Sequence, residues 1–325
     1  MNQGGAVSPI VVLGSLNMDL VVALPHLPRP AETVVGERLQ SFPGGKGANQ
    51  AVAAARLGGD VKMIGRVGSD AFGDTLIRGL GMDGVDTSRV ERDTLAPTGA
   101  ALILVERSGQ NMIAVAPGAN ATVGNLDVER AAECLHSNSL LLLQLEVPLP
   151  AVEAATWAAH RLGARVILNA APAATLPKEL LRGLDVLVVN EIEASALFGR
   201  AVETHDDAAA AGRAALKLGV VAALVTRGAA GAVLVTATGV SHIDAIPVDA
   251  VDATAAGDAF VGALAVALAQ GASLLDAARL GAAAGTAAAA RPGAQSSLPR
   301  SNEVLDVLSK DADWAADILN RRKST

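Results

Sequence analysis

Short apolar segments alternate with alanine-rich segments of helical length along most of the chain, and this alternation constrains the fold more than any other feature. The apolar segments are rich in leucine, valine and isoleucine and lie near residues 10, 61, 140, 165, 186 and 221. Strands that alternate with helices build a mainly parallel sheet. Because these strands are apolar almost throughout, we expect helices to cover both faces of the sheet. The predicted fold is therefore α/β and doubly wound.

Two regions depart from this alternation. Residues 20–43 contain four prolines and a patchy apolar alternation that is typical of edge strands. Residues 98–106 and 112–120 predict a hairpin. We expect the regions at about 20–43 and 98–120 to form a small β-sheet outside the main core of a single domain, residues 1–325, in a position where it can serve as a lid.

Composition argues against several classes of function. A net charge of -7 and an aromatic content of 2% disfavour a nucleic-acid partner, which basic clusters and aromatic rings usually bind. The five histidines are scattered without metal-ligand spacing, so a zinc site is not expected. The longest uncharged stretch, 259–275, is too short to span a membrane, and the first residues lack the features of a signal peptide. The expectation is a cytoplasmic enzyme or binding protein.

Polar residues close four of the predicted strands, namely Glu146, Asn169, Asn190 and Thr226. Ligands of open α/β sheets bind outside the carboxyl ends of the strands, so we expect these four side chains to line one crevice. The alternative is that the strand ends simply meet solvent, which is the better explanation for any one of them taken alone.

Two further segments offer candidate binding residues. Gly44–Gln50 begins an alanine-rich helix; its glycines permit the close approach of a ligand, and Lys46 and Asn49 supply a cation and an amide one helical turn apart. Asn17 and Asp19 follow the first strand, where a carboxylate can either accept hydrogen bonds from sugar hydroxyls or cap a turn.

The segment Ala255-Ala256-Gly257-Asp258 precedes a long and almost uncharged helix. Unpaired N–H groups and the helix dipole favour an anion at a helix N-terminus, so the segment predicts an anion hole. The same dipole predicts a pKa for Asp258 below the usual value of about 3.9. Phosphoryl transfer needs positioning and charge neutralisation more than a strong base, and a carboxylate beside an anion hole suits it. The alternative is an aspartate that only caps the helix.

With these residues in view, the chain resembles the ribokinase-type family of carbohydrate and nucleoside kinases over nearly its full length, and within that family the bacterial ribokinases. The motifs that carry the resemblance are GSLNMDL (14–20), GGKGANQAVAA (44–54), QLE (144–146), NEIE (190–193), TRGAAG (226–231), VDATAAGDAF (251–260) and RPGAQSS (291–297). The resemblance implies a ribokinase-like fold and the ATP-dependent phosphorylation of the primary 5-hydroxyl of D-ribose to ribose 5-phosphate.

The resemblance also implies a role for each matching residue. Asp258 is implied to be the base that deprotonates the sugar hydroxyl, and Ala255, Ala256 and Gly257 to form the anion hole for the transferred phosphoryl group. The residues implied to contact the sugar are Asn17, Asp19, Gly45, Lys46, Asn49, Glu146, Asp252 and Asp258. Those implied to lie along ATP are Asn190, Thr226, Gly228, Gly231 and Gly257.

Metal ions and a second subunit are implied by the same resemblance. Glu193 is implied to help place Mg²⁺ through water, and dimers of the family form through the lid. A monovalent cation, K⁺, is implied at Asp252, Thr254, Ala288, Arg291, Gly293 and Ser297, partly through backbone carbonyl oxygens.

The chain departs from the family pattern in three places, one of which is residues 169–172, where one proline of the family's segment is missing. Ala253 stands where threonine is common, so a hydroxyl is missing, and Gly281 stands where a larger polar residue often contacts the adenine. Two alternatives also stay open. A kinase for another furanose or for a nucleoside would keep Asp258 and change only the pocket, whereas a non-catalytic sugar-binding protein would bind ribose without turnover.

Overall fold

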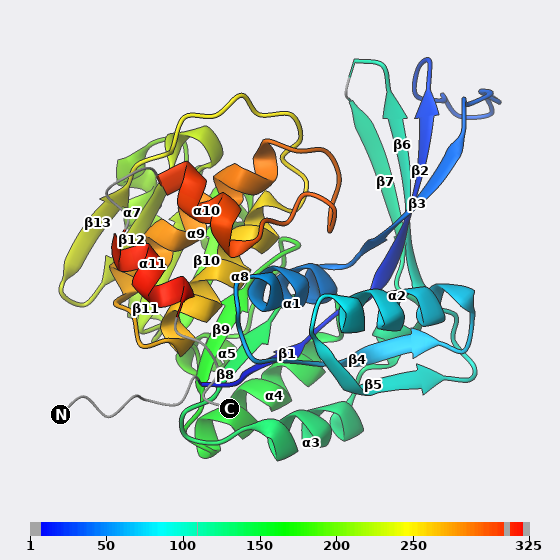
Figure 1. Cartoon of the computed structure of the whole chain (residues 1–325). Helices are drawn as coiled ribbons and strands as arrows, with labels where there is room; N and C mark the ends of the chain where they lie inside the picture. Colours follow the sequence, from blue (N-terminus) through cyan, green and yellow to red (C-terminus); the bar gives the residue numbers. More distant parts are fainter. Residues whose placement is uncertain (1–7, 109, 309–312, 321–325) are drawn as a thin grey trace.

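The computed structural model describes residues 8–108, 110–308 and 313–320, and it contains a nine-stranded main sheet (Figure 1). The strand order is β13-β12-β11-β10-β9-β8-β1-β4-β5. Seven strands run parallel: β1 (Ile10–Leu13), β4 (Val61–Gly68), β5 (Asp86–Asp93), β8 (Leu140–Leu143), β9 (Arg165–Asn169), β10 (Val186–Asn190) and β11 (Ala222–Thr226). Two more, β12 (Ala232–Thr236) and β13 (Gly239–Ile243), pair antiparallel at one edge. The prediction of a mainly parallel sheet is confirmed.

Helices cover both faces of this sheet, as predicted. In β1 the side chains of Ile10 and Val12 belong to the core on one face, and those of Val11 and Leu13 to the core on the other. The first face is covered by α1 (Lys46–Arg56), α2 (Ala71–Met82), α8 (Ala256–Ala269), α9 (Leu274–Ala289), α10 (Ser301–Leu308) and α11 (Asp313–Leu319). The second is covered by α3 (Asn125–Cys134), α4 (Leu149–Arg161), α5 (Lys178–Arg182), α6 (Glu191–Phe198) and α7 (His205–Lys217).

A separate four-stranded sheet projects from the main body (Figure 1). Its order is β3 (Leu39–Gly44), β2 (Asn17–Leu24), β6 (Gly99–Glu106) and β7 (Asn111–Ala116), and we call it the small sheet. The predicted hairpin at 98–120 is its β6–β7 pair. β2 begins earlier than the predicted boundary at residue 20, so Asn17 and Asp19 belong to the small sheet and not to a loop after β1.

Helix α8 is apolar almost throughout because it is packed between α1 and α9. A Cβ atom at Gly262 would lie 2.6 Å from the Cβ of Ala53, so only glycine lets α8 approach α1 this closely. A Cβ atom at Gly281 would lie 2.9 Å from the carbonyl oxygen of Phe260, which shows that position 281 faces α8. Glycine at position 281 therefore permits the close packing of α9 against α8.

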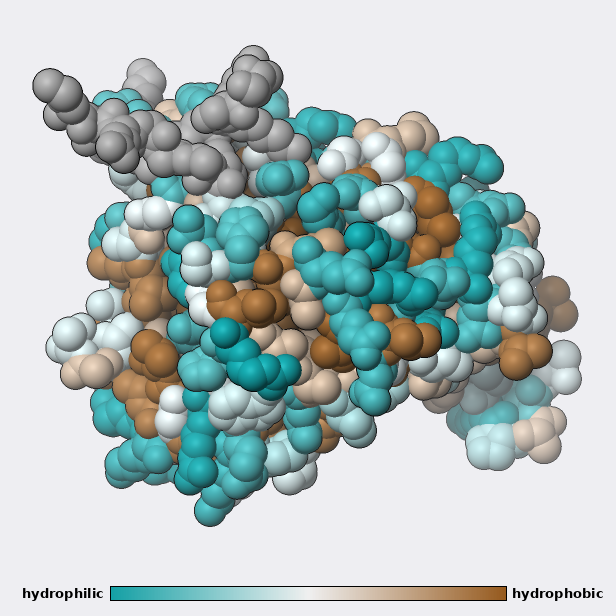
Figure 2. Space-filling view, turned by 90° about the horizontal axis from the view of Figure 1, so that it is seen from below, coloured by the Kyte–Doolittle hydropathy of each residue, from teal (hydrophilic) through white to brown (hydrophobic). Residues whose placement is uncertain are grey.

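The surface is mixed in polarity. Figure 2 shows hydrophobic residues in small groups among hydrophilic ones on the face seen from below. Of the large apolar side chains that are exposed, four lie on β6 and β7 of the small sheet, and each is about half exposed: Leu102, Met112, Ile113 and Val115. Within the described residues, no helix has the length and apolar character needed to cross a membrane.

Candidate active site

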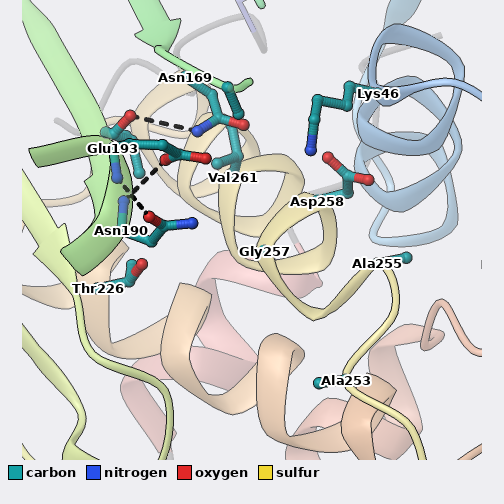
Figure 3. A pocket seen from close by; sticks show the side chains of 12 residues that line it. Lys46, Asn169, Asn190, Glu193, Thr226, Ala253, Ala255, Gly257, Asp258 and Val261 are labelled. Carbon is teal, nitrogen blue, oxygen red and sulfur yellow. Dashed lines mark hydrogen bonds between the residues drawn. The ribbon is translucent and has the colours of Figure 1, made fainter. Parts of the chain in front are cut away.

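A cleft of about 200 Å³ opens at the carboxyl ends of the parallel strands, between them and the start of α8 (Figure 3). Three of the four strand-end residues, Asn169, Asn190 and Thr226, line this cleft. The fourth, Glu146, lies beyond the end of β8, where its carboxylate accepts hydrogen bonds from the Ser15 hydroxyl at 2.5 Å and from the backbone N–H of Lys46 at 2.9 Å. Glu146 thus supports the start of α1, which borders the cleft.

Asp258 lies in the first turn of α8 and is only 6% exposed. The side-chain amide of Asn49 donates to its Oδ2 and that of Gln50 donates to its Oδ1, each at 2.9 Å. The side chain of Lys46 points toward the same carboxylate (Figure 3). The close contact between α8 and α1 therefore brings together residues that are separated by about 200 positions in the sequence.

Burial raises the pKa of Asp258, although Lys46 and the two amides of Asn49 and Gln50 act in the opposite direction. The expectation of a lowered pKa is wrong because removing a carboxylate from water costs more than the neighbouring charge and donors return. A raised pKa makes the carboxylate a better proton acceptor than an exposed aspartate.

The carboxylate of Asp258 is the end of a buried amide network that the sequence did not reveal. Gln50 donates from Nε2 to both Asp258 and Asn169, and its Oε1 accepts from Gln144 Nε2 at 2.6 Å. Asn169 in turn donates to the carbonyl oxygen of Val188 at 3.2 Å. The only sequence signal was that Gln50 and Gln144 stand inside the quoted motifs, next to residues that had been assigned.

The N-terminus of α8 faces the cleft with unpaired donors. Ala255 is the N-cap residue and has φ 61, a left-handed conformation. The N–H of Ala256 already donates to the Ala253 carbonyl at 3.2 Å, so the expectation that it belongs to an anion hole is revised. Among the described residues, the N–H groups of Ala255, Gly257 and Asp258 have no acceptor. Gly257 is exposed and lines the cleft.

Charged groups gather where α1, the small sheet and α8 meet. Burial, together with the nearby carboxylates of Glu146 and Asp258, raises the pKa of Asp19 to about 7. Burial by itself would lower the pKa of Lys46, but the attraction of Asp258, Glu146 and Glu193 outweighs it and the pKa is raised. Carboxylates are strong acceptors for hydroxyl groups, so this cluster can bind a ligand that carries several hydroxyls.

The junction between the small sheet and α1 needs glycine. Gly45 caps α1 with φ 90, and a Cβ atom there would lie 2.8 Å from the backbone nitrogen of Asn17. The side chain of Asn17 is 3% exposed and its Oδ1 accepts from Asn120 Nδ2 at 2.7 Å. Asn120 also bonds both backbone groups of Leu16, so it fixes the start of the strand that carries Asn17, and no sequence motif pointed to this residue.

On the other side of the cleft, Asn190 and Glu193 cap α6 reciprocally. Asn190 N–H donates to Glu193 Oε2, and Glu193 N–H donates to Asn190 Oδ1, both at 2.8 Å. Burial raises the pKa of Glu193. Gly228 and Gly231 begin and follow the short 3-10 turn η2 (Gly228–Ala230) with positive φ values of 49 and 81, and both lie outside the set of residues that line the cleft.

The residues implied for a monovalent cation come from two loops that meet and, in the case of Ala288, from the end of α9. Asp252 accepts from the backbone N–H groups of Thr254 and Gly293, each at 2.9 Å. Burial alone would raise the pKa of Asp252, but these hydrogen bonds outweigh the effect of burial, so the pKa lies below its usual value. Asp252 is not among the residues that line the cleft, but its neighbour Ala253 is.

The second of these loops is itself well anchored. The N–H of Arg291 donates to the Ala288 carbonyl at 3.1 Å, while its guanidinium pairs with Glu303. Ser297 is fully buried and its hydroxyl donates to the Ala294 carbonyl at 2.8 Å. Within the described ranges, no cluster of three or more His, Cys, Asp or Glu side chains could hold a metal ion.

Comparison with known proteins agrees with this geometry. Residues 8–301 match the family described as pfkB family carbohydrate kinase. The chain is 40% identical over 300 residues to a ribokinase of Haemophilus influenzae, covering 92% of this chain and 98% of that one. It is 39% identical over 257 residues to a deoxyribokinase of Salmonella typhi, covering 79% and 84%.

Solved structures give the same answer at the level of the fold. The ribokinase of Arabidopsis thaliana, determined with ribose and ATP, superposes with a TM-score of 0.86 at 34% identity and covers 94% of this chain and 99% of its own. The predicted ribokinase-like fold is confirmed. A family match over nearly the whole chain, together with these identities, shows that the chain belongs to the pfkB family of carbohydrate kinases.

Proposed function

We propose that the protein is an ATP-dependent ribokinase that transfers the γ-phosphoryl group of ATP to the primary 5-hydroxyl of D-ribose. The observation that carries the proposal is the position of Asp258: a buried carboxylate with a raised pKa, beside Lys46 and the unpaired N–H groups of Ala255 and Gly257. Kinship with ribokinases at about 40% identity supports ribose as the sugar.

In the proposed mechanism the oxygen of the sugar hydroxyl bonds to the γ-phosphorus of ATP while the bond from that phosphorus to ADP breaks. Asp258 accepts the proton that the hydroxyl loses. The N–H groups of Ala255, Gly257 and Asp258 stabilise the negative charge on the transferred group. The Asn49 and Gln50 amides hold the carboxylate, and this leaves its remaining lone pairs for the hydroxyl. Asn17, Asp19, Gly45, Lys46 and Glu146 would bind the other parts of the sugar.

ATP would lie along the opposite side of the cleft, against Asn190 and Thr226. We extend this assignment to Gly228 and Gly231, whose turn follows β11. Bound Mg²⁺ would neutralise phosphate charge, and Glu193 fits the role of orienting its water ligands because only one carboxylate oxygen is used in the helix cap.

A potassium site would form where Asp252 joins Thr254 to Gly293. Potassium prefers oxygen ligands, and the backbone carbonyl groups of these loops, with those of Ala288, Arg291 and Ser297, would supply them. The missing hydroxyl at Ala253 would leave such backbone ligands intact. In this proposal Asp252 holds the two cation-binding loops together.

We also propose that the chain is a single domain whose small sheet acts as a lid and joins two subunits in a homodimer. The half-exposed Leu102, Met112, Ile113 and Val115 would be covered in that dimer. Sedimentation velocity would test this, and Ile113→Asp is expected to yield monomers. We place the reaction in the cytoplasm, where its phosphoryl donor ATP is available.

The test of the activity is ADP release in the presence of ribose, 2-deoxyribose, fructose and a nucleoside such as adenosine. The expected result is the highest kcat/KM with ribose. A higher value with 2-deoxyribose would support the second candidate, which the likeness to a deoxyribokinase favours. Ribose binding without ADP release would mean a sugar-binding protein and would refute the kinase proposal.

A further inference from the structure

Arg227 directly follows Thr226 at the end of β11, and its nearly buried side chain contacts three residues. Nη2 donates to the carbonyl oxygen of Glu203 at 2.6 Å. Nη1 lies 3.0 Å from Nδ1 of His205. Nε lies 3.6 Å from the carboxylate of Glu191, the first residue of α6. One side chain therefore joins the end of β11 to the starts of α6 and α7.

The contacts of His205 determine its protonation state. Its Nε2 lies 3.0 Å from the carbonyl oxygen of Ala230, which can only accept, so Nε2 carries the proton. The guanidinium of Arg227 can only donate, so Nδ1 must be the unprotonated acceptor. Both contacts are satisfied together only by the neutral ring. His205 thus ties together Arg227 and Ala230, which flank and end the short turn η2.

We infer that Arg227 and His205 are positioning residues for the nucleotide end of the cleft, an inference that rests on the proposed function. The turn that they hold contains Gly228 and leads to Gly231. The helix start that Arg227 contacts through Glu191 belongs to the same first turn as the reciprocal cap between Asn190 and Glu193. The two segments proposed to bind ATP are therefore connected through one arginine.

The same geometry makes this connection sensitive to pH. A proton on Nδ1 of His205 replaces an acceptor with a donor and places positive charge against the guanidinium. The ring centroid of His242 on β13 lies 5.2 Å from that of His205, and the first turn of α7 also carries Asp206 and Asp207. The α7 N-terminus also opposes a positive charge. ATP affinity should therefore fall when His205 becomes protonated at low pH.

The experiment compares wild type, His205→Ala and His205→Asn at about pH 7.5 and about pH 5.5. The dissociation constant of ATP is measured by calorimetry, and KM for ATP and ribose by ADP release. Asparagine can place its carboxamide oxygen near the position of Nδ1 and does not titrate. His160→Asn on α4, which packs on β8 and β9, makes the same chemical change elsewhere.

His205→Ala is expected to raise the ATP dissociation constant by about tenfold at about pH 7.5, on the scale of one hydrogen bond to a charged group, without changing KM for ribose. His205→Asn should bind ATP nearly as well as wild type and lose less affinity on acidification. The ATP phosphates titrate equally in every sample. The difference between wild type and His205→Asn in the loss of ATP affinity on acidification therefore reports on His205 alone. The His160→Asn control should follow wild type.

A lower melting temperature of His205→Ala with an unchanged ATP dissociation constant would show a purely structural contact and overturn the inference. It would also be overturned if His205→Asn lost affinity with pH as wild type does. Failure of the proposed function gives a different result, namely no ADP release by wild type with any sugar. Arg227→Lys combined with His205→Ala should cost no more than the larger single effect if the two residues act through one contact.

Discussion

The two sides of the cleft are built differently. On one side, Asp258 and Lys46 stand at the starts of α8 and α1 (Figure 3), and the buried amides of Asn49 and Gln50 hold the carboxylate. On the other side, Asn190 and Thr226 end neighbouring strands, and hydrogen bonds within one short segment hold the cap of α6. The first side is fixed by packing between parts of the chain about 200 residues apart, and the second by the local cap of α6 and by the contacts of Arg227.

This difference separates the expected effects of substitution. The carboxylates of the first side are buried, so the pKa values of Asp19 and Asp258 are both raised. A substitution of either residue is therefore expected to alter the stability of the fold as well as the chemistry. At the second side Asn190 and Thr226 are uncharged and only half-buried, so a change there should act mainly on ATP binding. The predictions below test that division.

The largest effect is expected from Asp258→Asn. An amide cannot accept the proton of the sugar hydroxyl, so turnover should fall by about 10³-fold, which is the usual scale of general base catalysis. The dissociation constant of ribose, measured by calorimetry, should change by no more than about threefold. Turnover close to that of wild type would remove Asp258 from the mechanism.

Gln50→Leu should damage the same side in a different way. It leaves Gln144 Nε2 and Asn169 Oδ1 without their buried partner and frees one oxygen of Asp258. The free energy of unfolding should fall by about 3 kcal/mol and kcat by about tenfold, with KM for ribose unchanged. Urea unfolding and ADP release measure the two effects.

Thr156→Val provides the control for that loss of stability. Thr156 is fully buried on α4, and its hydroxyl donates only to the Val152 carbonyl. We expect this variant to be destabilised at unchanged kcat. If Gln50→Leu behaved in the same way, the amide network would stabilise the fold without orienting Asp258.

The two sides also differ in how far the sequence revealed them. The apolar strands and the polar residues that end them at 169, 190 and 226 follow a local pattern, and the structure has all three at the cleft. The contacts of Gln50 with Gln144 and Asp258 depend on how α1 and α8 pack, and no local pattern encodes that packing.

The pKa of Asp258 shows the same limit in energetic terms. A carboxylate in the first turn of a helix predicts a lowered pKa if it meets water, and only the packed structure shows that it is buried. The strand β5 was missed for a related reason: it lies at a sheet edge, and its polar sequence lacks an apolar pattern. In both cases the deciding quantity was burial, which a single segment does not determine.

Asp19→Asn should stabilise the protein in a pH-dependent way. The pKa of Asp19 is about 7 in the folded chain, against 3.8 for an ordinary aspartate, so between these values the folded state holds a proton that the unfolded state has lost. Stability therefore falls as pH rises toward about 7. The variant should gain about 2 kcal/mol at about pH 8 and nothing at about pH 4, as read from urea unfolding at each pH.

An equal gain at both pH values would mean that ionisation of Asp19 is not the cause. The same variant is expected to bind ribose more weakly, because asparagine replaces a charged acceptor with a neutral amide. If Asp19→Asn gains stability but loses affinity for the sugar, then Asp19 serves sugar binding at a cost to the stability of the fold.

The smallest effect is expected at the second side, from Thr226→Val. The threonine hydroxyl donates to the Val189 carbonyl over 3.4 Å, a long and weak bond, and valine has nearly the same shape. Stability should therefore change by no more than about 0.5 kcal/mol. KM for ATP should rise by about threefold, and KM for ribose should not move, because Thr226 lies across the cleft from Lys46 and Asp258 (Figure 3). An effect on ribose instead of ATP would reverse the assignment of the two sides.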